Sequence, residues 1–454
     1  MKLFGTDGIR GRINEHPMTP ETVLRIGMAS AKLLRKLHQG RNMVLIGKDT
    51  RLSGYMIESA LTSGICSMGM DVTLVGPLPT PGIAFLTRTL RVDAGIVISA
   101  SHNPFQDNGI KFFSHKGFKL PDGIEKKIEK LVADESLFKH RPKGENAGKA
   151  FRLDDATGRY IEYIKSTLAK GTTLEGIKVV VDSANGAAYK TTPWLLRELG
   201  AEVISLHDKP DGMNINRDCG STYMGALQKA VRMHKADVGI AHDGDGDRTL
   251  FCDEKCRLVD GDTIMGMCAV DMEMRGQLKK GAVVATVMSN LGLERHLDRH
   301  GIRLIRTNVG DRFVVEKMLD GGYNLGGEQS GHIVFLDLNT TGDGPITAVQ
   351  VLNLMKVRNV SLSKLTSSIK LFPQVLQNIT IQKKKDISSI PEIQDSIRKA
   401  EKKLNKRGRL LVRPSGTEPK IRVMLEGEDM KLINRLAGDI SRVVKKYMSD
   451  NQGI

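Results

Sequence analysis

Residues 236–248 read ADVGIAHDGDGDR, a short apolar strand followed by a loop of alternating aspartate and glycine. In an extended or looped segment alternate side chains point the same way, so Asp243, Asp245 and Asp247 are expected to converge. Three negative charges so close together repel one another unless a cation neutralises them, and Mg²⁺ with oxygen ligands is the first choice. The glycines let the backbone turn tightly around the ion. The sequence therefore predicts a metal site at the end of a strand, with phosphate as the leading candidate for what it acts on.

The same alternation of apolar strand and polar loop recurs along the chain. Further strands, with helical patterns between them, are predicted at residues 43–46, 94–99, 177–181, 282–288 and 303–307. A helix is predicted to begin at Pro20, because Thr19 can cap it and apolar residues follow at helical spacing. Strands alternating with helices favour α/β layers with largely parallel pairing. In such sheets functional side chains collect on loops at the carboxyl ends of strands, where Ser101 and Asp243 are expected.

The pattern changes after about residue 370. An amphipathic helix near residues 390–404 is followed by strands at 409–413 and 421–425 and a final helix at 430–447, which predicts a smaller α+β unit. A chain of 454 residues exceeds what one hydrophobic core can organise. Domains are therefore expected at residues 1–150, 151–252, 253–368 and 369–454.

The composition is that of an ordinary globular protein, with 40% hydrophobic and 26% charged residues. Aromatic residues make up only 4%, so a base-stacking surface for nucleic acid is poorly supplied. The formal net charge of +16 favours an anionic partner. Much of the excess, however, lies in short basic runs typical of solvated faces, such as residues 383–385 and 402–409.

The five cysteines are odd in number and irregularly spaced, which argues against a disulfide framework. Cys252 and Cys256 have no second cysteine or histidine pair nearby, so a zinc site is not expected. The first residues lack the apolar stretch of a signal peptide, and no run of about 18 apolar residues could cross a membrane. A reducing cytoplasm is the expected location.

A second motif, ISASHNPFQDNGIK at residues 98–111, places a serine directly after a predicted strand. The Ser101 hydroxyl could act as a nucleophile or carry a phosphate, and His102 or Lys111 could manage its proton. Pro104 disfavours helix at the preceding residue and holds the loop open. The same residues also suit a polar turn before a helix. Beside a metal loop the motif favours phosphoryl transfer, with a hydroxyl to carry the group and a cation to stabilise it.

A third motif, RPSGTEPKIR, combines two arginines with hydroxyl groups on a glycine turn. Exposed backbone N–H groups and hydroxyls on such a turn form a nest for an anion, and arginine binds phosphate in a forked, bidentate way. A solvated hairpin turn is the alternative. Phosphate binding is favoured because both hydroxyls and both arginines fall within one short segment, at Arg413, Ser415, Gly416, Thr417 and Arg422.

Two weaker motifs complete the set. GGEQSGHI at residues 326–333 places Glu328 and Ser330 in the same phase, where they could hydrogen-bond neighbouring sugar hydroxyls. His332 could act nearby, although a lone histidine is more often structural. The N-terminal string FGTDGIRG puts Arg10 after a glycine-rich turn, from which it could reach a phosphate.

Together the five motifs resemble the α-D-phosphohexomutase superfamily, in the same order and over essentially the whole chain. SASHNP, DGDGDR, GEQSGH and RPSGTEP carry the resemblance. Within the superfamily the chain is most similar to the bacterial phosphoglucosamine mutase branch, through TTGDG at residues 340–344 and PDGMNINRDCGST at 210–222. Gln329 stands where phosphomannomutase/phosphoglucomutase relatives typically carry methionine. His242 is a small departure, because relatives usually have an apolar residue before the aspartates.

The resemblance implies four domains around one deep cleft, three with a similar mixed α/β core and a fourth with a helix-flanked sheet. It implies interconversion of glucosamine 6-phosphate and glucosamine 1-phosphate through a 1,6-bisphosphate, on the route to UDP-N-acetylglucosamine and cell wall. Ser101 would be the phosphoserine that activity requires. One Mg²⁺ per subunit would bind that phosphate together with Asp243, Asp245 and Asp247. A homodimer is also suggested, with neither nucleic acid nor membrane as a partner.

Further residue roles follow from the same resemblance. Sugar hydroxyls would be bound by Glu328 and Ser330. The reaction centre would be lined by Arg10, His102, Lys111, Arg248 and His332. The substrate's non-reacting phosphate would be bound by Arg413, Ser415, Gly416, Thr417 and Arg422. Lys111 is the first candidate for general base and His102 the second, since a buried lysine flanked by cations can have a lowered pKa.

Three other functions are compatible with parts of the sequence. A phosphoglucomutase or phosphomannomutase would keep the fold and change the sugar. A metal-dependent phosphatase would use the same serine and release inorganic phosphate. A basic nucleic-acid-binding protein is suggested only by the net charge, and no RNA- or DNA-binding motif supports it.

Overall fold

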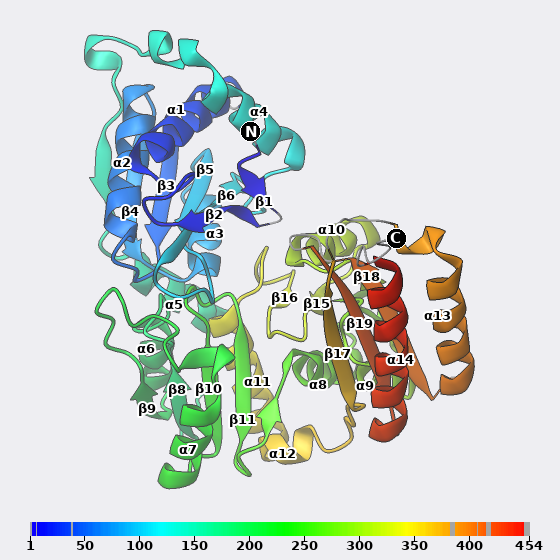
Figure 1. Cartoon of the computed structure of the whole chain (residues 1–454). Coiled ribbons are helices and arrows are strands. Elements are labelled where there is room, and N and C mark those ends of the chain that lie inside the picture. Colours follow the sequence, from blue (N-terminus) through cyan, green and yellow to red (C-terminus); the bar gives the residue numbers. More distant parts are fainter. Residues whose placement is uncertain are drawn as a thin grey trace, which may run out of the picture. The chain divides into compact units, whose positions relative to one another are not determined.

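The computed structural model describes residues 2–5, 7–37, 40–381, 386–405, 407–414 and 419–448 (Figure 1). It forms two compact units. The larger comprises Met1–Met288 and His300–Ser367, and the smaller comprises Ser289–Arg299 and Ser368–Ile454. In the described part of the chain, three sheets belong to the larger unit and a fourth to the smaller one.

The first sheet has the strand order β1-β2-β6-β5-β3-β4-β7. Its strands are β1 (Phe4–Gly5), β2 (Gly8–Arg12), β3 (Met43–Lys48), β4 (Asp71–Pro77), β5 (Ala94–Ile98), β6 (Asp107–Ser114) and β7 (Ala150–Arg152). The accompanying helices are α1 (Pro20–Leu37), α2 (Gly54–Ser67), α3 (Thr80–Thr89) and α4 (Asp122–Ala133). β3 pairs parallel with β4 and β5, whereas β6 runs antiparallel to both β5 and β2. Because α2 and α3 both pack on β3 and β5, these strands are buried and read as continuous apolar runs.

The helix predicted at Pro20 is confirmed as α1. The Thr19 hydroxyl accepts a hydrogen bond from the Thr22 backbone N–H at 3.4 Å, as the predicted cap requires. The buried face of the helix includes Val23 and Leu34, two of the apolar residues that the sequence places at helical spacing.

The second sheet has the order β12-β11-β10-β8-β9. Its strands are β8 (Lys178–Asp182), β9 (Glu202–Leu206), β10 (Val238–His242), β11 (Thr249–Asp253) and β12 (Leu258–Val259). Its helices are α5 (Ala156–Ser166), α6 (Thr191–Glu198) and α7 (Gly225–His234). β10 is parallel to β8, as predicted, but antiparallel to β11.

The third sheet has the order β14-β13-β15-β16. Its strands are β13 (Ala282–Thr286), β14 (Arg303–Thr307), β15 (Leu325–Gly327) and β16 (Ile333–Phe335), so β13 ends at Thr286 rather than Met288. Its helices are α8 (Gly261–Met274), α10 (Asp311–Gly321), α11 (Gly344–Arg358) and α12 (Leu362–Leu365). Short 3₁₀ segments in the chain are Glu135–His140, Gly144–Asn146, Gly220–Thr222, Lys279–Gly281 and Ile387–Ser389.

The smaller unit is a three-stranded antiparallel sheet of order β17-β19-β18 with helices on it. Its elements are α9 (Leu291–Asp298), β17 (Gln374–Thr380), α13 (Pro391–Leu404), β18 (Gly408–Pro414), β19 (Lys420–Gly427) and α14 (Met430–Met448). Its core joins Val423 and Leu425 of the sheet to Ile433 and Ile440 of α14. The predicted α+β unit is confirmed. No helix among the described residues is long and apolar enough to cross a membrane.

Three motif loops share one topological position. SASHNP joins β5 to β6, DGDGDR joins β10 to β11, and GEQSGH joins β15 to β16. Each of these strand pairs is antiparallel. The strands before the loops, β5, β10 and β15, pair in parallel with β3, β8 and β13, as expected. The strands after the loops do not, so the sheets are mixed.

Arg51, in the loop after β3, holds the SASHNP loop in place. Its side chain is fully buried, and its Nε lies 2.8 Å from Asp49 Oδ2. Its terminal nitrogens donate to the backbone carbonyl oxygens of Ser101, Asn103 and Asp107 at 2.9, 2.8 and 3.0 Å. One buried guanidinium thus fixes the backbone on both sides of the loop.

Replacing Arg51 with alanine should lower the free energy of unfolding by about 3–5 kcal/mol, because it leaves Asp49 buried without its cation. Chemical denaturation followed by circular dichroism measures the loss. Arg159→Ala, which removes an exposed ion pair with Asp155, is the control and should leave the denaturation midpoint unchanged. Equal midpoints for the two variants would contradict the role given to Arg51.

Candidate active site

Ser101 starts the loop between β5 and β6 and is buried, with a backbone φ of 51°. A positive φ is uncommon for a residue with a Cβ and persists only where its surroundings impose it. Here Arg51 and Asn216 each donate to the Ser101 carbonyl oxygen at 2.9 Å, while the Ser101 N–H donates to Ser99 Oγ at 2.9 Å. In this conformation Ser101 Oγ donates a 2.6 Å hydrogen bond to Asp243 Oδ2.

The three aspartates converge as predicted. One carboxylate oxygen from each lies within 4.8 Å of the others, and all three residues are buried. Oδ1 of Asp245 and Oδ1 of Asp247 are buried and accept no hydrogen bond from any other described residue. Gly244 lets the aspartate loop approach the loop that carries Ser101, because a Cβ at residue 244 would lie 2.5 Å from the Ser101 carbonyl oxygen. Such a set of oxygens fits Mg²⁺, which prefers carboxylates and hard oxygen ligands.

Burial and neighbouring charges act differently on these carboxyl groups. Burial, and then Asp247 and Asp245, raise the pKa of Asp243 well above its ordinary value. Burial opposes ionisation of Asp247 too, but Lys111 and His332 hold its pKa below the ordinary value. The protein's own cations therefore offset the negative charge of Asp247 more than that of Asp243. Asp243 is thus the carboxylate whose charge most needs a bound metal ion to neutralise it.

Lys111, on β6, is surrounded by carboxylates. Its Nζ lies 2.8 Å from Asp245 Oδ2, 3.5 Å from Asp7 Oδ2 and 3.6 Å from Asp247 Oδ2. Burial alone would lower the pKa of Lys111, but these three carboxylates raise it above the ordinary value. The expectation that neighbouring cations lower this pKa is therefore wrong for this arrangement. The side chain is a buried ammonium.

His102 directs Nδ1 to 3.2 Å from Ser101 Oγ. Burial, Arg248 and Arg10 lower the pKa of His102 to about 4, so its ring is neutral at neutral pH. Arg10 pairs with Asp7, and Arg248 Nε lies 3.9 Å from Asp247 Oδ1 in the aspartate loop. The structure therefore brings the residues expected at the reaction centre from the first two sheets to one place.

The loop between β15 and β16 adds the predicted residues of the third sheet. His332 Nδ1 lies 3.6 Å from Asp247 Oδ2, and its Nε2 accepts a hydrogen bond from the Gly342 N–H at 3.0 Å. Ser330 Oγ donates to Glu328 Oε2 at 3.3 Å. Glu328 and Ser330 are half-buried neighbours and present an acceptor and a hydroxyl together.

Gln329, which stands where phosphomannomutase/phosphoglucomutase relatives typically carry methionine, contacts the residue that caps a helix. Its Nε2 donates to Asp260 Oδ2 at 3.4 Å, and Asp260 Oδ1 accepts from the Thr263 N–H at the start of α8. The side chain therefore ties the loop that carries Glu328 to α8.

His242, the departure from relatives, is structural. Its Nδ1 lies 3.1 Å from the Arg248 carbonyl oxygen and its Nε2 lies 2.9 Å from Thr192 Oγ1. A carbonyl oxygen only accepts, so Nδ1 carries the proton and Nε2 accepts from the threonine. Burial lowers the pKa of His242 to about 4. The neutral ring spans the aspartate loop without displacing its carboxylates.

Sequence reasoning missed four residues that contact this site. Thr80 Oγ1 donates to Asp245 Oδ2 at 2.7 Å. Lys119 Nζ lies 2.5 Å from Asp311 Oδ2 and also contacts Asp7. Asp7 stands within FGTDGIRG and Asp311 follows the glycine of NVGDRF, so an aspartate next to a glycine could have identified both residues from the sequence. No sequence pattern pointed to Lys119 or Thr80.

In the smaller unit, Arg413 and Arg422 are direct partners across β18 and β19. Like charges facing one another across a sheet are destabilising, and a bound anion relieves the repulsion. Burial and Arg422 lower the pKa of Arg413, whose buried Nε makes no hydrogen bond with the described residues. The pair is suited to bind a phosphate. The predicted partners Ser415, Gly416 and Thr417 lie outside the described residues.

Comparison with known proteins gives the family. Models of phosphoglucomutase/phosphomannomutase match the chain in four successive segments, as α/β/α domains I, II and III and a C-terminal domain, at residues 1–139, 158–257, 260–372 and 376–443. The chain belongs to the phosphoglucomutase/phosphomannomutase family, the α-D-phosphohexomutases. It is thus a phosphohexomutase, an isomerase.

Its relatives include curated phosphoglucosamine mutases. Those of Thermodesulfovibrio yellowstonii and Pelobacter propionicus are each 55% identical to this phosphohexomutase over 99% of its chain and 100% of their own. A solved phosphoglucomutase/phosphomannomutase family protein from Burkholderia thailandensis shares 25% identity at a TM-score of 0.81, covering 98% of this chain and 97% of that one. Aspergillus fumigatus N-acetylphosphoglucosamine mutase, solved with GlcNAc-6P and magnesium, has the same fold, with a TM-score of 0.68, 17% identity and coverage of 99% and 96%.

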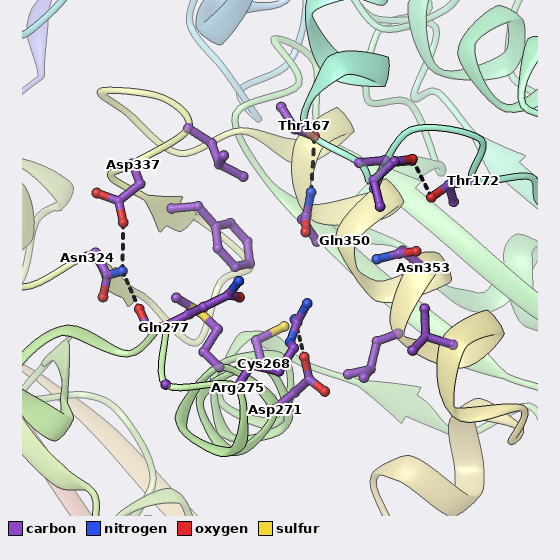
Figure 2. Close-up of a pocket in the computed structure, with 18 of the residues that line it drawn as sticks. Thr167, Thr172, Cys268, Asp271, Arg275, Gln277, Asn324, Asp337, Gln350 and Asn353 are labelled. Atoms are coloured by element: carbon purple, nitrogen blue, oxygen red, sulfur yellow. Dashed lines mark hydrogen bonds and ion pairs between the residues drawn. The ribbon is translucent and has the colours of Figure 1, made fainter.

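A separate cavity of this phosphohexomutase lies between α8, α11 and residues 167–172 and has a volume of about 780 Å³ (Figure 2). Asp271 at its edge is already paired with Arg275 and Arg358. None of the predicted site residues that the structure describes lines this cavity. The predicted chemistry is therefore not located there.

Replacing Arg413 with glutamine should raise the KM for a sugar phosphate at least about tenfold, since it removes half of a forked phosphate site. Without substrate the variant should be no less stable than the wild type, because a like-charge repulsion is removed. Steady-state kinetics and thermal unfolding with and without inorganic phosphate measure both effects. Arg407→Gln, at an exposed position of the same unit, is the control. An unchanged KM in Arg413→Gln would contradict the assignment.

Proposed function

We propose that this phosphohexomutase interconverts glucosamine 6-phosphate and glucosamine 1-phosphate. The observation that carries the proposal is the buried hydrogen bond from Ser101 Oγ to Asp243 Oδ2 within the cluster of three aspartates. A hydroxyl in that position suits a phosphoryl carrier, because the carboxylates can hold the cation that phosphate chemistry uses. The names of the curated relatives support glucosamine phosphate as the substrate.

The proposed reaction starts with a phosphate on Ser101. The free hydroxyl oxygen of the sugar bonds to phosphorus, the bond from phosphorus to Ser101 Oγ breaks, and the hydroxyl proton passes to a base. The resulting 1,6-bisphosphate reorients within the site. Ser101 Oγ then bonds to the other phosphorus, the bond from that phosphorus to the sugar breaks, and the sugar oxygen regains a proton. No co-reactant is consumed.

The proposed roles follow the positions of the side chains. His102, whose neutral ring reaches Ser101 Oγ, is the candidate for the base, because Lys111, the first candidate from the sequence, is a buried ammonium with no lone pair to accept a proton. Mg²⁺ held by Asp243, Asp245 and Asp247 would neutralise charge on the transferring phosphoryl group. Arg10 would help to neutralise that charge. The substrate would be bound by Arg248, Glu328, Ser330 and His332, and its other phosphate by Arg413 and Arg422 together with Ser415, Gly416 and Thr417.

The enzyme's domains, cellular location and oligomeric state are also part of the proposal. We propose four domains at residues 1–150, 151–252, 253–368 and 369–454, a cytoplasmic location and a homodimer. Light scattering during size-exclusion chromatography tests the dimer.

A coupled assay comparing the 6-phosphates of glucosamine, glucose and mannose tests the substrate. Turnover should be fastest with glucosamine 6-phosphate. Faster conversion of glucose or mannose phosphate would favour the phosphoglucomutase or phosphomannomutase alternative. Release of inorganic phosphate without isomerised product would identify a phosphatase instead.

Ser101→Ala should lower turnover by several orders of magnitude while the sugar phosphate still binds, because only the phosphoryl carrier is lost. Coupled kinetics and calorimetric titration measure turnover and binding. Intact mass should show a phosphate adduct on the wild type that the variant lacks. Ser59→Ala, on the exposed side of α2, is the control. Near-normal turnover in Ser101→Ala would refute the mechanism.

Asp243→Asn should weaken Mg²⁺ binding by on the order of 10–100-fold, because a ligand loses its charge while the side chain keeps its shape. The Mg²⁺-dependent rise in melting temperature measures binding without reference to activity. Asp154→Asn, at an exposed position, is the control. The same Mg²⁺ midpoint in both variants would exclude Asp243 as a ligand.

A further inference from the structure

Two consecutive residues at the start of α10 contact the region of the first sheet. Asp311 Oδ2 lies 2.5 Å from Lys119 Nζ. Arg312 pairs with Asp122 and lies 3.8 Å from Glu125 Oε2, both on α4. Asp311 and Arg312 are adjacent and have opposite charges, and each contacts an oppositely charged side chain more than 180 residues away in sequence.

The contact between Asp311 and Lys119 belongs to a closed ring of ionisable side chains. Lys119 also contacts Asp7, and Asp7 Oδ2 lies 3.5 Å from Lys111 Nζ. On the other side, His332 Nε2 lies 3.6 Å from Asp311 Oδ2 and its Nδ1 lies 3.6 Å from Asp247 Oδ2. Lys111 Nζ closes the ring at 3.6 Å from Asp247 Oδ2. The members, in order, are Lys111, Asp7, Lys119, Asp311, His332 and Asp247.

Every member of this ring is largely shielded from water, with side-chain exposure between 2% and 25%. Lys119 is held between two carboxylates, Asp7 and Asp311. If its charge were removed, those carboxylates would face one another in a poorly solvated space and repel. Asp7 and strand β2, which carries Arg10, would then separate from the start of α10 beside His332.

We propose that Lys119 and Asp311 are positioning residues. Their ion pair holds Asp7, the neighbouring Arg10 on β2 and His332 in register with Lys111 and Asp247. The inference rests on the proposed function and adds a role that none of the five motifs contains. Neither residue is needed for the metal or as a phosphoryl carrier. Arg312, with its partners on α4, anchors the same helix from outside the ring.

Because the pair acts through other groups, its loss should lower kcat more than it raises KM. Lys119→Met and Asp311→Asn should each lower kcat for glucosamine 6-phosphate by on the order of 10–100-fold, with KM within about threefold of the wild type. The double variant should be no slower than the slower single variant, since both break one interaction. Lys119→Arg, which keeps the charge, should restore kcat to within about threefold.

The control is a Lys–Asp ion pair on the surface with the same distance between Nζ and the carboxylate oxygen. Lys279 Nζ lies 2.5 Å from Asp337 Oδ1, with both side chains about half exposed. Lys279→Met and Asp337→Asn should leave kcat and KM unchanged. Thermal unfolding of every variant separates loss of the fold from loss of positioning, and Asp311→Asn keeps the test valid if Lys119→Met does not fold.

The outcomes separate this inference from the proposed function. An inactive wild type would refute the proposed function, whereas an active wild type with unchanged kcat in Lys119→Met and Asp311→Asn would refute the positioning role alone. A raised KM with unchanged kcat would overturn it in favour of direct substrate binding. Additive losses in the double variant would also overturn it, because two independent roles would then be present.

Discussion

Three buried carboxylates within 4.8 Å of one another are the constraint on which the site depends. Charges at this separation in a poorly solvated space repel strongly, so positive charge must be supplied around Asp243, Asp245 and Asp247. Lys111 and Arg248 supply part of it from the protein. The buried carboxylate oxygens that accept no hydrogen bond from the described part of the chain are hard ligands of the kind that Mg²⁺ prefers.

The fold satisfies this constraint by placing chemical groups on equivalent loops. In each of the first three sheets, a buried strand passes directly into a loop and returns as an antiparallel neighbour. The loops carry a hydroxyl, a carboxylate cluster and a pair of sugar-binding candidates. Buried side chains fix them, as Arg51 does for Ser101 and His242 for the aspartates. The chemistry is therefore built on rigid backbone.

Charge balance also connects parts of the chain that are distant in sequence. Lys111 would be an unusual buried cation by itself, yet it is surrounded by carboxylates from two other loops. Lys119 extends that balance to Asp7 and Asp311. A buried ion pair is costly to form and more costly to break, so such a ring favours one arrangement of its loops over others.

The sequence by itself determined the strand-and-loop repeat, the α/β class and the residues at the loop tips, because hydrophobic periodicity and short motifs are local properties. It determined the convergence of the three aspartates for the same reason, since their spacing of two fixes their direction. It did not determine the antiparallel return of each loop, the buried role of Arg51 or the charge state of Lys111. The role of Arg51 and the charge state of Lys111 depend on partners 50 and 134 residues away, which only the tertiary structure brings together, and electrostatic energies in a buried site are set by such neighbours.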